Sequence, residues 1–169
     1  MTSKRLWALL IGLVAAVGIY AGTVSETPET GFTSTTLSKG RFYPINLSTY
    51  SLAGHGRAQW GVLAKTKGQS DLYVQSNVWT PGGTSGWHTH PGPSLITVTA
   101  GTVTVYDGDD PSCTPHRYSA GDGFVDYGGE HVHLIRNEGA VDAKSITVQL
   151  IPADATRRID APDPGNCHF

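Results

Sequence analysis

The sequence predicts an all-β domain, either a sandwich or a barrel, and three observations support this prediction. From residue 41 onward the apolar residues come in short runs that suit strands and are too short for helices. Glycine occurs 21 times and proline 10 times among 169 residues, and charged residues make up only 15%. This composition is typical of a turn-rich folded protein, and the length fits one domain rather than two.

Turns separate the expected strands. Ala100-Gly101 lies between two alternating runs and predicts a tight hairpin, because glycine tolerates the positive φ that such turns need. The tail after Ile151 is rich in Pro, Ala and Asp, and it predicts at most one short helical turn near residues 153–158. The expected strands cover residues 42–47, 59–66, 71–78, 94–100, 102–106, 123–126, 132–136 and 144–151.

The first 24 residues differ from the rest of the chain. Lys4 and Arg5 precede an uncharged apolar stretch, residues 6–24, whose length lies between that of a secretory signal and that of a membrane-spanning helix. We expect residues 1–24 to form a hydrophobic helix that is either a signal peptide or a transmembrane anchor. The protein would then be extracytoplasmic, secreted or anchored to the cell membrane. Residues 25–40 should be a flexible linker and residues 41–169 the folded domain.

Charge and cysteine content narrow the function classes. The formal net charge of -2 comes with no basic stripe, so nucleic acid is not an expected partner. The two cysteines, Cys113 and Cys167, can form a disulfide in an oxidising compartment, and the alternative is a pair of free thiols. The sequence has no G-x-S-x-G, phosphate-loop or H-E-x-x-H motif, so the common hydrolase and nucleotide-binding classes have no support.

Two pairs of histidines indicate a metal site. His88 and His90 are separated by one residue, and on an extended strand such a pair faces one side. A second pair with the same spacing, His131 and His133, follows later in the chain. Together the four side chains offer enough nitrogen donors to surround one divalent ion.

The segment around the first pair resembles a known family motif. Residues 82–101 read GGTSGWHTHPGPSLITVTAG, which is similar to the first motif of the cupin superfamily: glycine, five residues, H-x-H, a short gap, an acidic residue, six residues and glycine. Gly82, His88, His90 and Gly101 stand at the expected positions. Ser94 stands at the acidic position.

The segment around the second pair resembles the second cupin motif with two departures. Gly121, Gly129, His133 and Asn137 match it. Tyr127 replaces the usual proline, and one extra residue separates Gly129 from the histidine. The spacing to Asn137 favours His133 over His131 as the matching histidine. The stretches SGWHTHPGPSLITVTAG, YDGDDPSC and GDGF are also similar to those of a group of small exported actinobacterial cupin-domain proteins, which carries no assigned chemistry.

This resemblance implies a single-domain cupin jelly-roll β-barrel with a metal bound by His88, His90 and His133. Ser94 and His131 are additional candidates for the metal shell, His131 as a partial substitute for the missing carboxylate. Iron(II) is the first expectation for the ion, and zinc, manganese, nickel or copper also suit imidazole ligands. Without a carboxylate, the site would keep the full charge of the ion and attract an anionic ligand.

Two functions follow from these expectations. The first is a binding protein for a divalent metal and a small molecule, without turnover. The second is an iron-dependent dioxygenase that acts on a small chelating organic acid or diketone-like substrate, and no catalytic acid or base is assigned for it. A homodimer is the default oligomer, because strands at the edges of sheets pair readily.

Overall fold

The computed structural model describes residues 25–51 and 60–169, and within them every regular element is a strand. Residues 1–24, which are predicted to form a helix that serves as a signal or an anchor, lie outside the described residues. Residue 59 of the second predicted strand also lies outside them. None of the described residues belongs to a helix that is long and apolar enough to span a membrane. The all-β prediction is therefore confirmed for the part of the chain that the structure describes.

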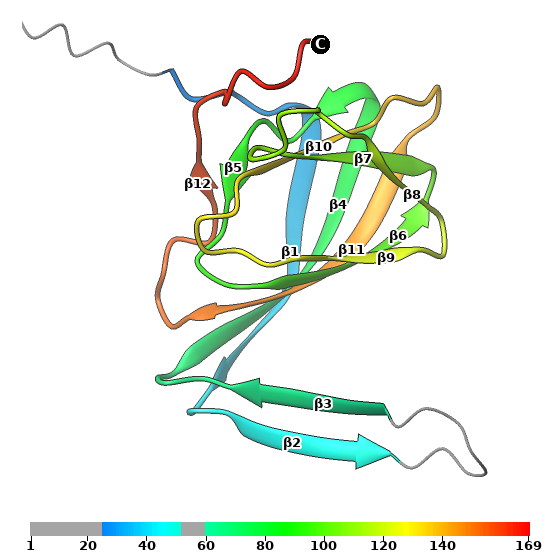
Figure 1. Ribbon diagram of the computed structural model, residues 1–169. Coiled ribbons are helices and arrows are strands. Elements are labelled where there is room, and N and C mark those ends of the chain that lie inside the picture. Colours follow the sequence, from blue (N-terminus) through cyan, green and yellow to red (C-terminus); the bar gives the residue numbers. More distant parts are fainter. Residues whose placement is uncertain (1–24, 52–59) are drawn as a thin grey trace, which may run out of the picture.

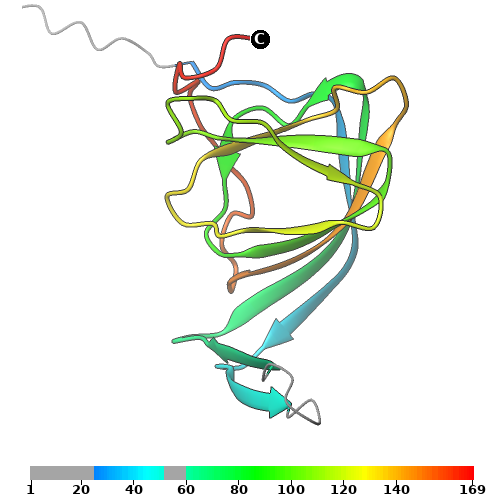
Figure 2. The ribbon, with the colours of Figure 1, turned by 45° about the vertical axis from the view of Figure 1, so that its right-hand side comes forward.

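The strands form a nearly closed barrel and one separate hairpin (Figures 1 and 2). One wall of the barrel follows the order β1-β4-β11-β6-β9, and the other consists of β12, β5, β10, β7 and β8. All of these pairs are antiparallel. The strands are β1 (Thr30–Phe42), β2 (Asn46–Ser51), β3 (Trp60–Lys65), β4 (Ser70–Thr84), β5 (His88–Thr89), β6 (Ser94–Ala100), β7 (Thr102–Asp107), β8 (His116–Ser119), β9 (Gly123–Asp126), β10 (His133–Arg136), β11 (Ala143–Pro152) and β12 (Ile159–Asp160).

Strand alternation decides what lies inside the barrel. Every second residue of β6 and β11 is buried, as expected for strands with one inward and one outward face. Toward one end the inward side chains are apolar and form a core of Trp79, Val98, Val103, Val105, Ile135 and Ala143. Farther along the same strands the inward side chains are polar, including Gln75, Thr147 and Gln149. The polar part of the interior is where the barrel can hold a ligand.

A second apolar cluster lies under the C-terminal tail. Trp87, Tyr106, Leu134, Ala161 and Cys167 are buried together there. Cys113 and Cys167 form a disulfide across a sequence separation of 54, which ties the tail to the loop after β7. The tail therefore belongs to the packed domain.

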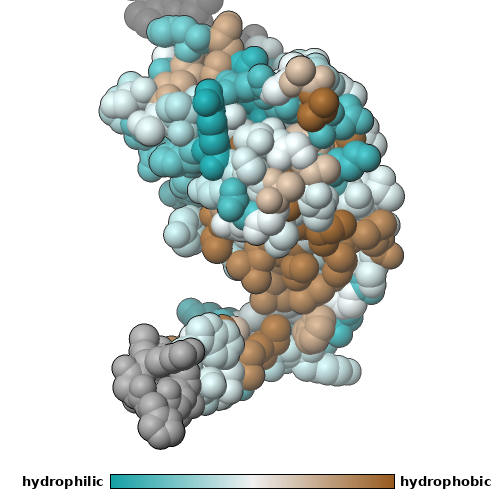
Figure 3. Space-filling view, turned by 90° about the vertical axis from the view of Figure 1, so that its right-hand side faces the viewer, coloured by the Kyte–Doolittle hydropathy of each residue, from teal (hydrophilic) through white to brown (hydrophobic). Residues whose placement is uncertain are grey.

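The hairpin β2–β3 projects away from the barrel (Figure 1). It pairs with no other strand among the described residues and exposes apolar side chains such as Tyr50, Trp60 and Leu63. Figure 3 shows further apolar surface on the part of the barrel that lies nearest to the hairpin.

The predicted flexible linker is wrong for residues 30–40, because these residues form most of β1. β1 pairs with β4 from Thr30, opposite Thr84, to Phe42, opposite Ser70. Most of its side chains are exposed at this edge of the sheet, so the strand carries Ser and Thr without an apolar stripe. Threonine still favours extended backbone. The folded domain consequently begins before residue 41.

Three further element predictions are corrected. No strand covers residues 42–47 as a unit, since β1 ends at Phe42 and Pro44 lies in the bend before β2. Residues 153–158 form turns and bends without a helix, and the short strand β12 follows them. The sequence does not predict β5 and β8, because β5 has only two residues and β8 has mostly exposed side chains, so neither carries an apolar run.

Candidate metal centre

Three of the four motif histidines meet inside the polar end of the barrel. His88 on β5 and His133 on β10 are directly paired across the two strands, and His90 follows β5 in the chain. The ring centroids lie 4.3 Å apart for His88 and His133, 4.9 Å for His88 and His90, and 5.6 Å for His90 and His133. One ligand atom from each lies within 4.8 Å of those of the other two. The geometry therefore suits a common ion at the distances of about 2.0–2.1 Å typical of imidazole ligands.

Backbone carbonyls orient two of these rings. His88 Nδ1 donates to Gly86 O at 2.9 Å, and His90 Nδ1 donates to Arg157 O at 2.8 Å. A carbonyl oxygen only accepts, so Nδ1 carries the proton in both rings, and Nε2 keeps its lone pair. This is how proteins orient metal-binding histidines, whose second ring nitrogen is held by a carbonyl or a carboxylate.

Burial keeps the three imidazoles in the neutral form that binds metals. His88 and His133 are 4% and 2% exposed. Burial holds the pKa of His88 well below its usual range, and the neighbouring His133 lowers it further. Burial also lowers the pKa of His90 and lowers the pKa of His133 to about 4. No proton therefore competes for these rings near neutral pH.

Asp126, at the end of β9, brings a carboxylate to the same place. It is 4% exposed, and Oδ2 lies 3.7 Å from His90 Nε2. Its Oδ1 accepts from Gly128 N at 2.9 Å and lies 3.5 Å from His133 Nδ1. Asp126 Oδ2 and His133 Nδ1 are both buried without a hydrogen-bond partner. Such unpaired buried polar atoms fit a site that takes up an ion.

Sequence analysis did not identify Asp126 as a site residue. Its backbone is paired with Ser94, which stands at the acidic position of the first motif. The carboxylate therefore comes from the neighbouring strand, β9, instead of from β6. The available signal was the placement of Asp126 at the end of a predicted strand that leads into a glycine-rich turn.

Two other motif residues have clear structural partners. Ser94 lines the cavity, and its hydroxyl accepts a hydrogen bond from Gln149 Nε2 at 3.2 Å. Asn137 is 1% exposed, and its Nδ2 donates to Trp79 O at 2.9 Å and Val141 O at 2.8 Å. Asn137 therefore holds β10 and the turn after it against β4, which fixes the strand that carries His133.

His131 does not join the three inward-facing histidines. It lies before β10 and lines a second cavity on the other side of His133. The two rings are stacked with their centroids 6.0 Å apart. The extra residue in the second motif precedes β10, where Gly128 and Gly129 both have positive φ. The chain here is a turn, so the rule that strand neighbours two apart share a face does not extend from His133 to His131.

The three histidines open into a cavity of about 290 Å³. Its walls include the polar side chains of Gln75, Asn77, Thr147 and Gln149 and the apolar side chains of Phe32, Trp79 and Ile96. Arg157 and Arg158 also line it. Arg158 is held by Asp160 Oδ1 and by Ser85 O, both at 2.6 Å. Arg157 is half-buried, burial lowers its pKa, and within the described part of the chain no carboxylate pairs with it.

The comparisons with known proteins agree with this fold. Residues 78–149 match the family described as the cupin domain, a span that runs from β4 into β11 and includes all three inward-facing histidines. The comparison therefore identifies residues 78–149 as a cupin domain, as the two sequence motifs predicted. A search of curated proteins finds no match.

Similar solved structures share only part of the chain. An oxalate oxidase structure is 20% identical with a TM-score of 0.41, and the alignment covers 48% of this chain and 46% of that one. A predicted oxalate decarboxylase from Thermotoga maritima is 21% identical with a TM-score of 0.39, covering 50% of this chain and 83% of that one. An uncharacterised protein with a double-stranded β-helix domain from Klebsiella pneumoniae is 21% identical with a TM-score of 0.43, covering 70% and 84%. The chain thus spans less than half the length of the oxalate oxidase, and these similarities transfer no activity.

Proposed function

We propose that this protein binds a divalent metal ion through His88, His90 and His133. The observation that carries the proposal is the convergence of three imidazoles, of which His88 and His133 are buried and His90 is partly buried. Nδ1 of His88 and of His90 is held by a backbone carbonyl. Asp126 Oδ2 is proposed as a fourth donor, since it is buried, unpaired and close to His90 Nε2. The carboxylate offsets one positive charge, which corrects the expectation of a site without any acidic group.

Iron(II) is the proposed ion. A set of imidazoles with one carboxylate suits iron, and zinc, manganese, nickel and copper are the alternatives that the same donors accept. When bound, such an ion supplies a Lewis acid with open positions for water or a small ligand.

The cavity is proposed to take a small anionic molecule. Arg157 offers the cavity a cation without a carboxylate partner in the described residues. A guanidinium binds a carboxylate through two parallel hydrogen bonds, which fixes the orientation of a small acid. The apolar walls around Trp79 and Ile96 would cover the rest of the molecule and exclude water.

The main proposal is binding without turnover, because neither of the carboxylates that line the cavity, Glu29 and Asp126, is assigned a role as a catalytic acid or base. The second candidate is an iron-dependent dioxygenase for a small chelating organic acid or a diketone-like substrate. Arg157 is the observation that favours it, since the residue could hold an acid beside the metal position. In that case Arg157 orients the substrate, and the histidines hold the ion.

Metal analysis of the full chain, purified without added affinity histidines, tests the main proposal. We expect about one bound ion at this site, which is lost in His90→Ala and kept in the control His168→Ala, whose imidazole is exposed. A metal content in His90→Ala equal to that of the natural chain would refute it. Oxygen consumption by iron-loaded protein with a panel of organic acids and diketones separates the two functions. Uptake that disappears in Arg157→Gln supports the dioxygenase, and no uptake supports the binding protein.

We also propose that the domain works outside the cytoplasm, either secreted or anchored to the membrane by residues 6–24. The disulfide supports this, because such bonds persist in oxidising compartments. The exposed edges of β1 and of the hairpin support a homodimer. A reporter fused to the C-terminus that is active only outside the cytoplasm would test the location.

A further inference from the structure

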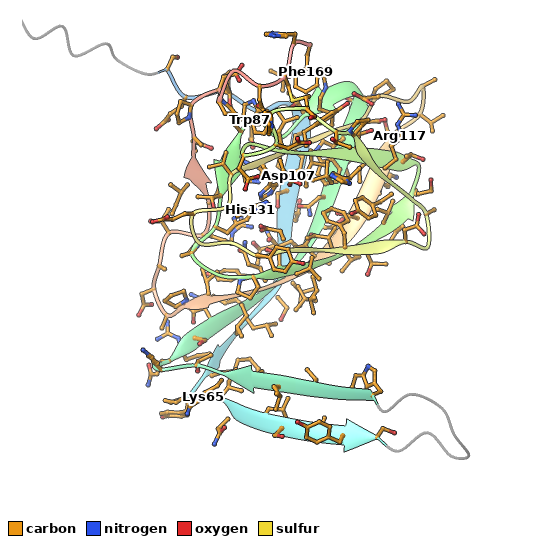
Figure 4. The ribbon with its side chains drawn as sticks, viewed as in Figure 1. Lys65, Trp87, Asp107, Arg117, His131 and Phe169 are labelled. Carbon is orange, nitrogen blue, oxygen red and sulfur yellow. A yellow bond between two sulfur atoms is a disulfide. The ribbon has the colours of Figure 1, made fainter. Side chains whose placement is uncertain are left out.

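A second cavity, of about 280 Å³, lies on the other side of His133 and Asp126. Its lining includes Asp107 at the end of β7 and His131 in the turn before β10. Figure 4 shows these two side chains close together on one side of the barrel, near the start of β10. His133 and Asp126 line both cavities, so they form the wall between them.

Three donor atoms converge at this wall. Asp126 Oδ1 lies 3.5 Å from His133 Nδ1 and 3.9 Å from His131 Nδ1. The three residues can each offer an atom within 4.8 Å of those of the other two. Both Nδ1 atoms are buried and have no hydrogen-bond partner, and His133 as a whole is only 2% exposed. Unpaired buried nitrogens are costly, so their common direction toward one carboxylate oxygen points to a missing partner.

Asp107 orients His131 toward that point. Its Oδ1 lies 3.3 Å from His131 Nε2, which favours the tautomer with the proton on Nε2. The lone pair of His131 is then on Nδ1, which faces Asp126. A carboxylate that fixes the far nitrogen of a histidine is a common support for metal ligands. His131 thus has a carboxylate beside its far nitrogen, where His88 and His90 have backbone carbonyls.

We propose that the second cavity binds another divalent cation through Asp126 Oδ1, His131 Nδ1 and His133 Nδ1. The two ions would share the Asp126 carboxylate and the His133 ring, with His88 and His90 on the first side and His131 on the second. With both sides filled, His133 would bind one ion through each ring nitrogen, and its one N–H proton would be released to solvent. The negative charges of Asp126, Asp107 and the resulting imidazolate offset the repulsion between the ions.

This inference extends the proposed function and shares two residues with it, but each side has a ligand of its own. The test is therefore titration of the full chain with Zn²⁺, which is redox-inert, followed by calorimetry and by metal analysis after dialysis. We expect about two equivalents for the natural sequence, about one for His131→Ala, about one for His90→Ala and none for the double variant. His168→Ala, outside both groups, should keep two.

Each other outcome overturns a specific statement. A natural chain that binds one equivalent, lost in His90→Ala and kept in His131→Ala, would refute the second site and leave the proposed function intact. One equivalent that is lost in His131→Ala and kept in His90→Ala would refute the proposed function and support the second site. Two equivalents that persist in His131→Ala would also refute the second site. Asp107→Asn is a milder variant. We expect it to weaken the binding of the second equivalent by about 10–100-fold and to leave the binding of the first unchanged.

Discussion

Acidification should destabilise the metal-free protein through its buried histidines, of which His133 is one. Burial lowers the pKa of His133 to about 4, whereas an unfolded histidine titrates near 6.5. Below the unfolded pKa the unfolded chain therefore binds a proton that the folded chain refuses, and stability falls as pH falls toward the folded pKa. Between about pH 7 and about pH 5 this linkage removes about 2 kcal/mol of unfolding free energy for His133 alone.

Urea unfolding of chelator-treated protein at both pH values measures this loss. Trp79 and Trp87 are 2% and 1% exposed, so tryptophan fluorescence reports the transition. In His133→Gln, the unfolding free energy should depend less on pH than in the natural chain, because the titrating group is gone. The matched control is His116→Gln, which removes an exposed imidazole on β8 and should change the pH dependence much less than His133→Gln does. Equal pH dependence in His133→Gln and the natural chain, or greater stability at the lower pH, would show that the buried-histidine argument is wrong.

Three further predictions concern the carboxylate, the loop that supports it and the disulfide. Asp126→Asn should weaken metal binding by about 10–100-fold in a Zn²⁺ titration. Adding Ser94→Glu to this variant should restore part of the affinity, because the two positions face each other across β6 and β9. Unchanged affinity in Asp126→Asn would exclude a role for the carboxylate. Gly128→Ala should lower the unfolding free energy measured in urea by about 1–3 kcal/mol, since Gly128 has a φ of 66° and an added Cβ would collide with Gly92 O. The variant should also bind Zn²⁺ more weakly. Unchanged stability would contradict the argument that this position requires glycine. Cys113→Ser should lower the unfolding free energy by about 3–4 kcal/mol, for a loop closed across 54 positions, and a natural chain that is equally stable with and without reductant would show that the bond does not form.

The sequence was sufficient for the fold class because strand alternation is a local property. The runs at residues 94–100, 102–106 and 123–126 coincide closely with β6, β7 and β9. Gly101 has a φ of 65°, as the hairpin between β6 and β7 required. β1 could not be predicted in this way, because its own residues carry no apolar alternation and its extended form depends on pairing with β4.

The candidate site divides in the same way. The spacing of His88 and His90 on one short segment is enough to predict that they act together, because two residues apart on extended backbone share a face. The sequence also limited the metal ligand of the second motif to His131 or His133. It did not determine toward which cavity the turn before β10 would orient each side chain. In the structure, Gly128 and Gly129 have positive φ and lead into the turn that carries His131, which lines a different cavity from His88 and His90.

What the sequence by itself determined about this protein is therefore its strand pattern, its cupin motifs and the histidines that carry them. Only the tertiary structure decided that Asp126 lies beside His90 and His133, and that the carbonyl of Arg157, 67 residues from His90, orients its ring. The physical reason is that these contacts join strands and loops distant in the chain, whose proximity depends on barrel closure and strand register. Neither of these quantities is encoded in the local spacing of residues.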